Sequence, residues 1–137
     1  MQTPHIPLAI RAKLSELWKA HEAAQASYVA ARVHADLVKI HGAIEHYYPT
    51  PVSLQLKPAS SQRTAIREEL RKLYFEYFNQ RGVDCVEAYF AALDNKYGRS
   101  HRYKFVSKTG DAGRAAAAEA ELARDKVNKL TRRPHVL

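Results

Sequence analysis

The stretch that decides the fold covers residues 62–97 and reads QRTAIREELRKLYFEYFNQRGVDCVEAYFAALDNKY. Apolar residues recur in its first half at steps of three and four, which is the spacing of one buried helical face. They are Ile66, Leu70, Leu73 and Tyr77. A second apolar periodic run follows Gly82, which interrupts the pattern. We therefore predict a helical hairpin over residues 62–98, with its two helices joined at Gly82.

We predict that the N-terminal segment, residues 1–48, forms one long helix or two helices bent near residues 25–30. Between Pro7 and Tyr48 the chain has no proline and a single glycine, Gly42. A helix of this length spans about 60 Å. The rest of the chain cannot cover such a helix along its whole length, so a protein partner or a homodimer through the long helix is a reasonable expectation.

Two shorter segments alternate between apolar and polar residues, as strands do. VSLQLK (52–57) lies in a linker over residues 49–61, and HRYKFVS (101–107) lies in a basic segment over residues 99–110. The two could pair as a minor two-stranded β ribbon. A C-terminal helix over residues 111–131 has a thin apolar stripe and is expected to be exposed, and a short tail (132–137) follows.

These elements predict a mainly α protein that forms a single helical domain over residues 1–137. Its 46% apolar and 26% charged residues are ordinary globular values. The lone cysteine, Cys85, excludes an intramolecular disulfide and favours a reducing compartment. We see no secretory signal and no apolar run of membrane-spanning length, so the expectation is a cytoplasmic protein that does not contact a membrane.

The charge is strongly basic and unevenly distributed. The chain has 22 Lys and Arg against 14 Asp and Glu, a net charge of +8. Residues 1–60 contribute six basic and four acidic residues, and residues 61–137 contribute the other sixteen and ten. A surplus of this size favours anionic partners such as nucleic acid.

Two groups of basic residues are the candidate nucleic-acid contacts. The first is a strip on the helix at 62–80, where arginines recur every four residues beside Tyr74 and Phe78. Phosphate-binding arginines with aromatic rings are typical of single-strand and RNA binding. The alternative is that the arginine stems cover the core edge, or that the arginines pair with acids on a neighbouring helix. The strip residues are Arg63, Arg67 and Arg71.

The second group lies in NKYGRSHRYKFVSKTG (95–110), which contains no acidic residue. If its centre is a strand, the aromatic side chains face the core and the charges face outward, where they can contact phosphates without reading sequence. A solvated loop is the competing interpretation. The basic candidates here are Lys96, Arg99, Arg102, Lys104 and Lys108.

Little in the sequence supports an enzyme. His34, His41 and Glu45 share one helical face and are the only metal candidates, but no Glu-x-x-His or His-x-x-x-His pair supports them. We find no nucleophile motif and no phosphate-binding glycine loop. We therefore expect no catalytic residues, no bound metal and no cofactor.

The resulting hypothesis is a small non-enzymatic nucleic-acid-binding or nucleoprotein-accessory protein that contacts the phosphate backbone. The main alternative is a protein-interaction module, such as an inhibitor, an adaptor or a small subunit of a larger complex. A metal-dependent enzyme is the third hypothesis. A winged-helix DNA-binding domain fits poorly, because its recognition helix would expose Glu87 and Asp94 in place of basic residues.

Overall fold

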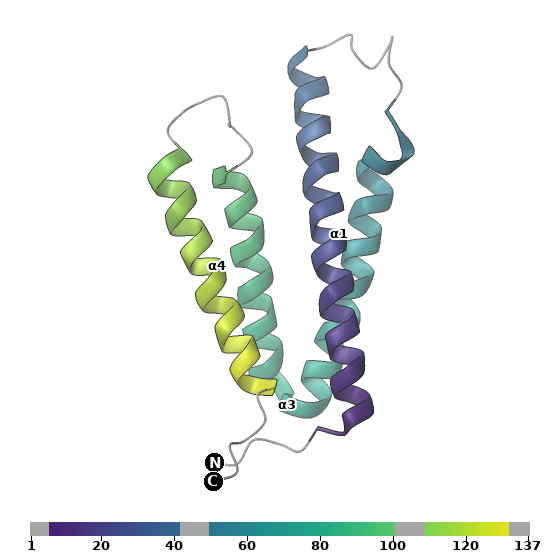
Figure 1. Cartoon of the computed structure of the whole chain (residues 1–137), viewed down its shortest axis with the longest axis vertical. Helices are drawn as coiled ribbons and strands as arrows, with labels where there is room; N and C mark the ends of the chain where they lie inside the picture. Colours follow the sequence, from purple (N-terminus) through teal and green to yellow (C-terminus); the bar gives the residue numbers. More distant parts are fainter. Residues whose placement is uncertain (1–5, 42–49, 101–108, 132–137) are drawn as a thin grey trace. The chain divides into compact units, whose positions relative to one another are not determined.

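The computed structural model describes residues 6–41, 50–100 and 109–131, which are almost entirely helical (Figure 1). The elements are helix α1 (Leu8–His41), a short 3-10 helix (Val52–Leu54), helix α3 (Leu56–Ser100) and helix α4 (Thr109–Thr131). The prediction of a mainly α fold is confirmed. Within these three described ranges there is no strand, and no helix is both long and apolar enough to cross a membrane.

Helix α1 is one unbroken helix, so the alternative of two helices bent near residues 25–30 is wrong. It begins directly after Pro7, whose carbonyl oxygen accepts hydrogen bonds of 3.0 Å from the backbone N–H groups of Ile10 and Arg11. Proline suits this place because its ring holds a helix-compatible φ. The predicted continuation through residues 42–48 lies outside the described residues.

Residues 52–57 do not form the predicted strand. The backbone N–H of Leu54 donates to the Pro51 carbonyl at 2.9 Å, and that of Gln55 donates to the Val52 carbonyl at 3.2 Å. These local bonds form the 3-10 turn, and α3 begins at Leu56. Pro58 is compatible with this start because the N–H groups of a first helical turn have no intrahelical partner. The proposed second strand, 101–107, lies outside the described residues.

Helix α3 contains the predicted hairpin, but the chain reverses at Asn79 and not at Gly82. Asn79 has a φ of 56° and a ψ of −149°, and it separates a first arm (residues 56–78) from a second arm (residues 80–100). Figure 1 shows the turn in the α3 ribbon at this point. The second arm continues to Ser100, beyond the predicted end at residue 98.

Gly82 allows the reversal through a close approach of the backbone. A Cβ atom at this position would lie 2.6 Å from the Tyr74 carbonyl oxygen and 2.6 Å from the Phe78 Cβ. Neither atom is the end of a flexible side chain, so a larger residue could not be accommodated without moving the first arm. The glycine is therefore important, but for a different reason from the helix end that we predicted.

The chain divides into two compact units, each described by itself. The first consists of Glu16–Glu68, in which most of α1 pairs with the start of α3. The pairing is antiparallel, because His21 contacts Arg67 whereas Gln25 contacts Arg63. Small side chains in the interior let the two helices approach closely. The buried apolar residues of this unit are Leu17, Ala24, Ala31 and Ala59.

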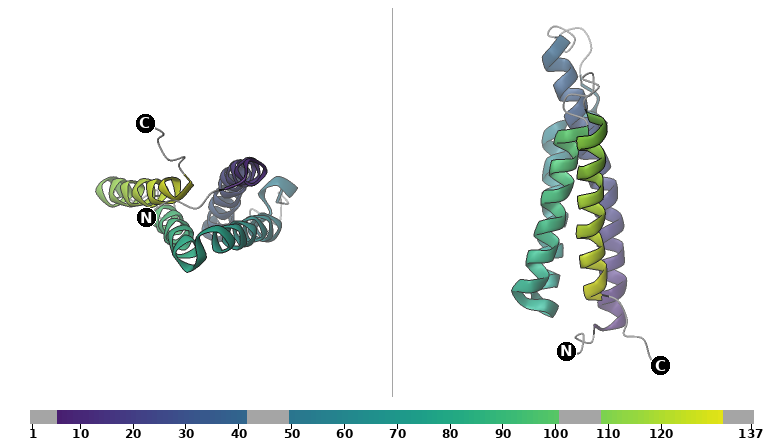
Figure 2. Two further views of the ribbon diagram at one scale, coloured as in Figure 1. Left: turned by 90° about the horizontal axis from the view of Figure 1, so that it is seen from below. Right: turned by 90° about the vertical axis from the view of Figure 1, so that its left-hand side faces the viewer.

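The second unit consists of Met1–Ser15 and Glu69–Leu137. Its core combines aromatic side chains of α3 with small and aliphatic side chains of α4, and α4 runs beside the second arm of α3 (Figure 2). The Arg11 Nη1 donates to the Thr131 carbonyl oxygen at 2.5 Å. Buried residues are Ile6, Leu14, Leu70, Tyr74, Phe78, Val86, Phe90, Ala116, Ala120, Val127 and Leu130.

Helix α4 is less exposed than we predicted, because most of its thin apolar stripe is buried in this core. Its opposite face remains exposed, including Leu122. The single-domain organisation over the whole chain stays a prediction.

We expect Gly82→Ala to lower the free energy of unfolding by about 1–3 kcal/mol, the usual cost of inserting a methyl group into a tightly packed site. Asn79→Gly should raise it by about 1 kcal/mol, because only glycine adopts this backbone conformation without strain. Urea denaturation measures both changes. Glu76→Gly, at an exposed position of the first arm, is the control and should cost about 1 kcal/mol. An unchanged or more stable Gly82→Ala variant would contradict this account of the reversal.

Candidate functional site

The arginine strip predicted to bind phosphates is turned toward neighbouring helices. Arg67 is only 6% exposed. Its Nε donates to His21 Nε2 at 3.1 Å, and its Nη2 donates to Gln25 Oε1 at 3.2 Å. Both partners belong to α1, so the guanidinium group joins α1 to the first arm of α3.

Arg63 makes a similar contact one turn earlier on α3. Its Nη1 donates to Gln25 Oε1 at 3.1 Å, and its guanidinium carbon lies 3.6 Å from the centre of the Tyr28 ring. An arginine over an aromatic face gains from the cation–π attraction as well as from packing. Arg63 is partly buried, and both of these contacts are with α1.

Arg71 joins the two arms of α3 in a similar way. It forms an ion pair with Glu87, and its guanidinium carbon lies 5.3 Å from the centre of the Phe90 ring. The strip thus follows the alternative that the sequence left open, in which the arginines pack along the core edge and pair across helices. These contacts weaken the case for Arg63, Arg67 and Arg71 as a phosphate-binding row.

His21 and Gln25 are the residues that sequence reasoning missed. His21 is 2% exposed, and its ring is nearly perpendicular to that of Trp18, with 5.7 Å between ring centres. Because arginine is always protonated and only donates, His21 Nε2 must accept, so the imidazole is neutral. The signal was in the sequence: polar residues four apart on one helix match arginines four apart on another.

The basic group at residues 96–108 covers, in sequence, the end of α3 and its connection to α4. Lys96 is exposed near the end of α3, and Arg114 is exposed near the start of α4. The Asn95 amide donates to Glu119 Oε2 at 3.4 Å, which places the end of α3 beside the middle of α4. Arg99 lies in the last turn of α3, but its side chain is outside the described part, as are the residues Arg102, Lys104 and Lys108.

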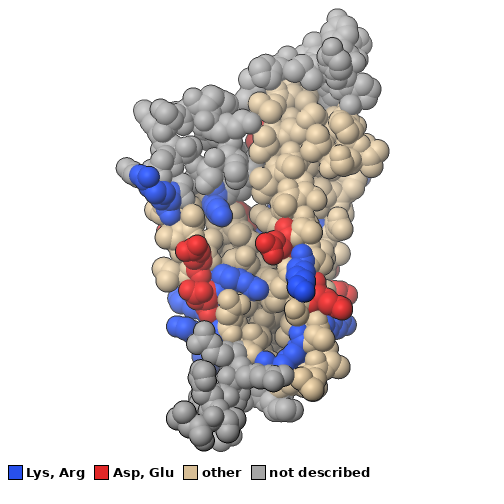
Figure 3. Space-filling view, viewed as in Figure 1, with Lys and Arg blue, Asp and Glu red and all other residues tan. Residues whose placement is uncertain are grey.

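The face shown in Figure 3 carries no broad positive patch over its described residues. Lys and Arg side chains over α3 and α4 alternate there with Asp and Glu. The excess positive charge of the second unit is instead concentrated in the sequence at the connection, where six Lys and Arg and one Asp occur between residues 96 and 114.

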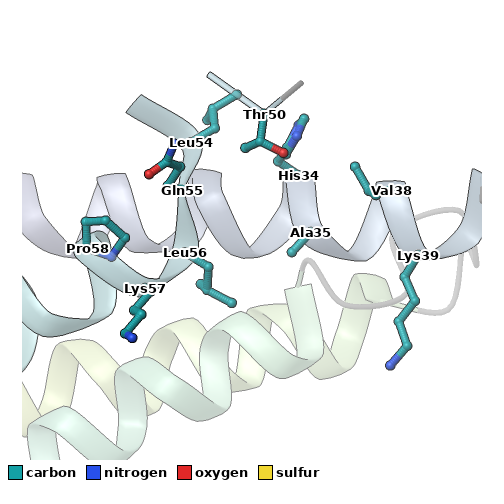
Figure 4. A pocket seen from close by; sticks show the side chains of 10 residues that line it. All are labelled: His34, Ala35, Val38, Lys39, Thr50, Leu54, Gln55, Leu56, Lys57 and Pro58. Atoms are coloured by element: carbon teal, nitrogen blue, oxygen red, sulfur yellow. The ribbon is translucent and has the colours of Figure 1, made fainter. Parts of the chain in front are cut away.

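A cavity of about 760 Å³ lies between α1 and the start of α3 (Figure 4). His34 Nε2 is buried there and has no hydrogen-bond partner in the described chain. The lining is mainly apolar, and the Lys39 and Lys57 side chains extend to one side of it. The lining residues are His34, Ala35, Val38, Lys39, Thr50, Leu54, Gln55, Leu56, Lys57 and Pro58.

The cavity does not complete the metal site that the sequence raised as a candidate. His34 lines it, but the side chain of His41 and the whole of Glu45 lie outside the described residues. Across residues 6–41, 50–100 and 109–131, no three His, Cys, Asp or Glu side chains are grouped closely enough to hold a metal ion.

A second hollow is a groove of about 620 Å³ between the second arm of α3 and α4. Leu122 is one of the residues that line the groove, and 64% of its surface is exposed. The groove is lined by Arg81, Asp84, Cys85, Ala88, Glu119, Leu122, Ala123 and Lys126.

No protein-family model, curated protein or solved structure matches this chain. The function must therefore be inferred from the chain's own residues. Three features carry chemical information: the basic connection between α3 and α4, the cavity at His34 and the groove at Leu122.

We expect Arg67→Ala to lower the free energy of unfolding by about 1–3 kcal/mol, because it removes the donor to His21 Nε2 and one of the two arginine donors to Gln25 Oε1. Lys72→Ala, an exposed residue of the same arm, is the control and should change it by less than about 0.5 kcal/mol. In a double-mutant cycle, His21→Ala should lower the free energy of unfolding less in the Arg67→Ala variant than in the wild type. Strict additivity would show that the two side chains do not interact.

The neutral state of His21 predicts a stability that falls in acid. An unfolded histidine takes up a proton near pH 6.5, whereas folded His21 cannot do so without losing its bond from Arg67. The unfolded state then binds more protons, so stability rises with pH, and this contribution is lost as pH falls below about 6.5. The contribution of His21 to the slope of the free energy of unfolding against pH is at most about 1.4 kcal/mol per pH unit.

The measurement is the free energy of unfolding at several pH values for the wild type and for His21→Gln. Glutamine can accept a bond from Arg67 but does not titrate, so the variant should lose stability less steeply in acid. Parallel curves for the two proteins would contradict the assignment of a neutral His21.

Proposed function

We propose that this protein binds nucleic acid through the phosphate backbone, using the basic connection between α3 and α4. The observation that carries the proposal is the concentration of charge. Residues 96–114 contain six Lys and Arg and one Asp, a net charge of +5 out of the chain's +8. A nucleic-acid duplex carries one negative charge per about 1.7 Å, so a short, dense basic segment is well matched to it.

The geometry of the described helices supports this location over the arginine strip. Lys96 and Arg114 are exposed at the ends of two helices that lie side by side. Arg67 contacts His21 and Arg71 pairs with Glu87, so both guanidinium groups are turned toward neighbouring helices. The proposed contact surface therefore consists of Lys96, Arg99, Arg102, Lys104, Lys108 and Arg114.

The proposed role is binding without catalysis. Contacts made by Lys and Arg to phosphates position a protein on nucleic acid but do not read base sequence. The proposal therefore predicts binding that depends on salt and tolerates many sequences. This behaviour fits a nucleoprotein accessory protein better than a sequence-specific regulator.

The test is a fluorescence-anisotropy titration of the protein with labelled single-stranded DNA, double-stranded DNA and RNA at several salt concentrations. For the triple variant Arg102→Gln, Lys104→Gln, Lys108→Gln we expect the slope of log K against log salt to shrink by about 2–3, since each phosphate contact contributes about 0.7–0.9. Binding at about 50 mM salt should weaken accordingly.

The matched control removes three exposed lysines elsewhere, in the variant Lys13→Gln, Lys72→Gln, Lys129→Gln. It lowers the net charge by the same amount, so an equal loss of affinity would place the binding outside the connection. Absence of binding by the wild type to all three nucleic acids at about 50 mM salt would overturn the proposal, because non-specific electrostatic binding is strongest at low salt.

A further inference from the structure

The groove between the second arm of α3 and α4 has an ordered charge pattern. The two helices run antiparallel here, and because Asn95 contacts Glu119, Ala88 lies level with Lys126. Arg81, Asp84 and Cys85 therefore lie toward the Lys126 end of the groove. Along α4 the groove thus runs from basic Lys126 through apolar Ala123 and Leu122 to acidic Glu119.

In the described structure the two carboxylates of the groove accept hydrogen bonds from neutral amides. Glu119 accepts only a long bond from the neutral Asn95 amide, and Asp84 accepts one of 2.9 Å from the neutral Gln80 amide. In the described part of the chain no carboxylate lies within ion-pair distance of Arg81 or Lys126. Both signs of charge are therefore available to a partner.

The groove is also electrically balanced, with two basic and two acidic side chains. This matters because the whole chain carries +8, so that two copies repel each other over most of their surface. A locally neutral patch is where that repulsion is smallest.

We propose that this groove is the contact surface of a symmetric homodimer. A two-fold axis near Leu122 places Lys126 of one copy against Glu119 of the other, and an isologous interface repeats this pair on both sides of the axis. The two α4 helices then cross antiparallel at Leu122, and Glu119 faces the partner's Lys126, with the reciprocal pair on the other side of the axis.

The spacing along α4 suits this arrangement. Glu119, Leu122, Ala123 and Lys126 follow at steps of three, one and three, which puts them on one face of the helix. The two charges are seven residues apart, or about 10.5 Å, with the apolar pair between them. Dimerisation would cover Leu122, one of the large apolar side chains that the monomer leaves exposed.

The decisive test is a charge swap followed by sedimentation velocity. The wild type should sediment as a dimer, with twice the 15.5 kDa mass of the chain. Lys126→Glu places like charges together at two symmetric positions and should weaken dimerisation more than about tenfold. The double variant Glu119→Lys, Lys126→Glu restores opposite charges and should restore the dimer.

Two further variants test whether the dimer forms through the groove and not through another surface. Leu122→Glu should give a monomer with an unchanged helical circular-dichroism spectrum, since Leu122 is exposed in the single chain. Lys129→Glu makes the same charge change on α4 outside the groove and should leave the dimer intact. A wild type that stays monomeric up to about 100 µM, where even weak association becomes visible, overturns the proposal whatever else the groove binds. A dimer that survives Lys126→Glu, or a charge swap that fails to restore it, overturns it equally.

Discussion

The reversal of the chain at Asn79 is the constraint on which the second unit depends. In a continuous helix Arg71 and Glu87 would be about 24 Å apart along the axis. They form an ion pair because α3 bends back on itself between them. The bend is sterically possible because Gly82 has no side chain where the Tyr74 carbonyl and Phe78 Cβ approach. The burial of Phe90 and Val86 beside the first arm follows from the same turn.

Arginine has a structural task in both units. In the first unit Arg63 and Arg67 reach polar and aromatic groups of α1, and in the second Arg71 reaches across the hairpin. The interior of the helix pair in the first unit consists largely of alanines, which bring backbones together but bury little apolar surface. The long arginine stems supply packing, while their guanidinium groups satisfy buried acceptors. This use of arginine reduces the number of positive charges that remain for an external partner.

Much of the helical content was predictable, and the errors have physical causes. The period of three to four residues located α1, the hairpin and α4, because a helix must bury one face. The strand prediction for residues 52–57 was wrong because the N–H groups of Leu54 and Gln55 donate to the Pro51 and Val52 carbonyls and so form a 3-10 turn. The turn was placed at Gly82 because glycine commonly ends helices, whereas here an asparagine adopts the unusual backbone conformation.

The candidate sites, like the helices, could be predicted only in part from the sequence. The basic, helical character of the protein and the concentration of charge near residues 96–114 could be predicted, because composition and periodicity are properties of the chain alone. The fold was needed to show that Arg67 contacts a neutral His21, that Arg71 pairs with Glu87, and that Leu122 lines a groove of balanced charge. The physical reason is that an arginine four residues from the next can face water or a neighbouring helix equally well. Which of these occurs depends on side chains brought close by the fold from distant positions in the chain.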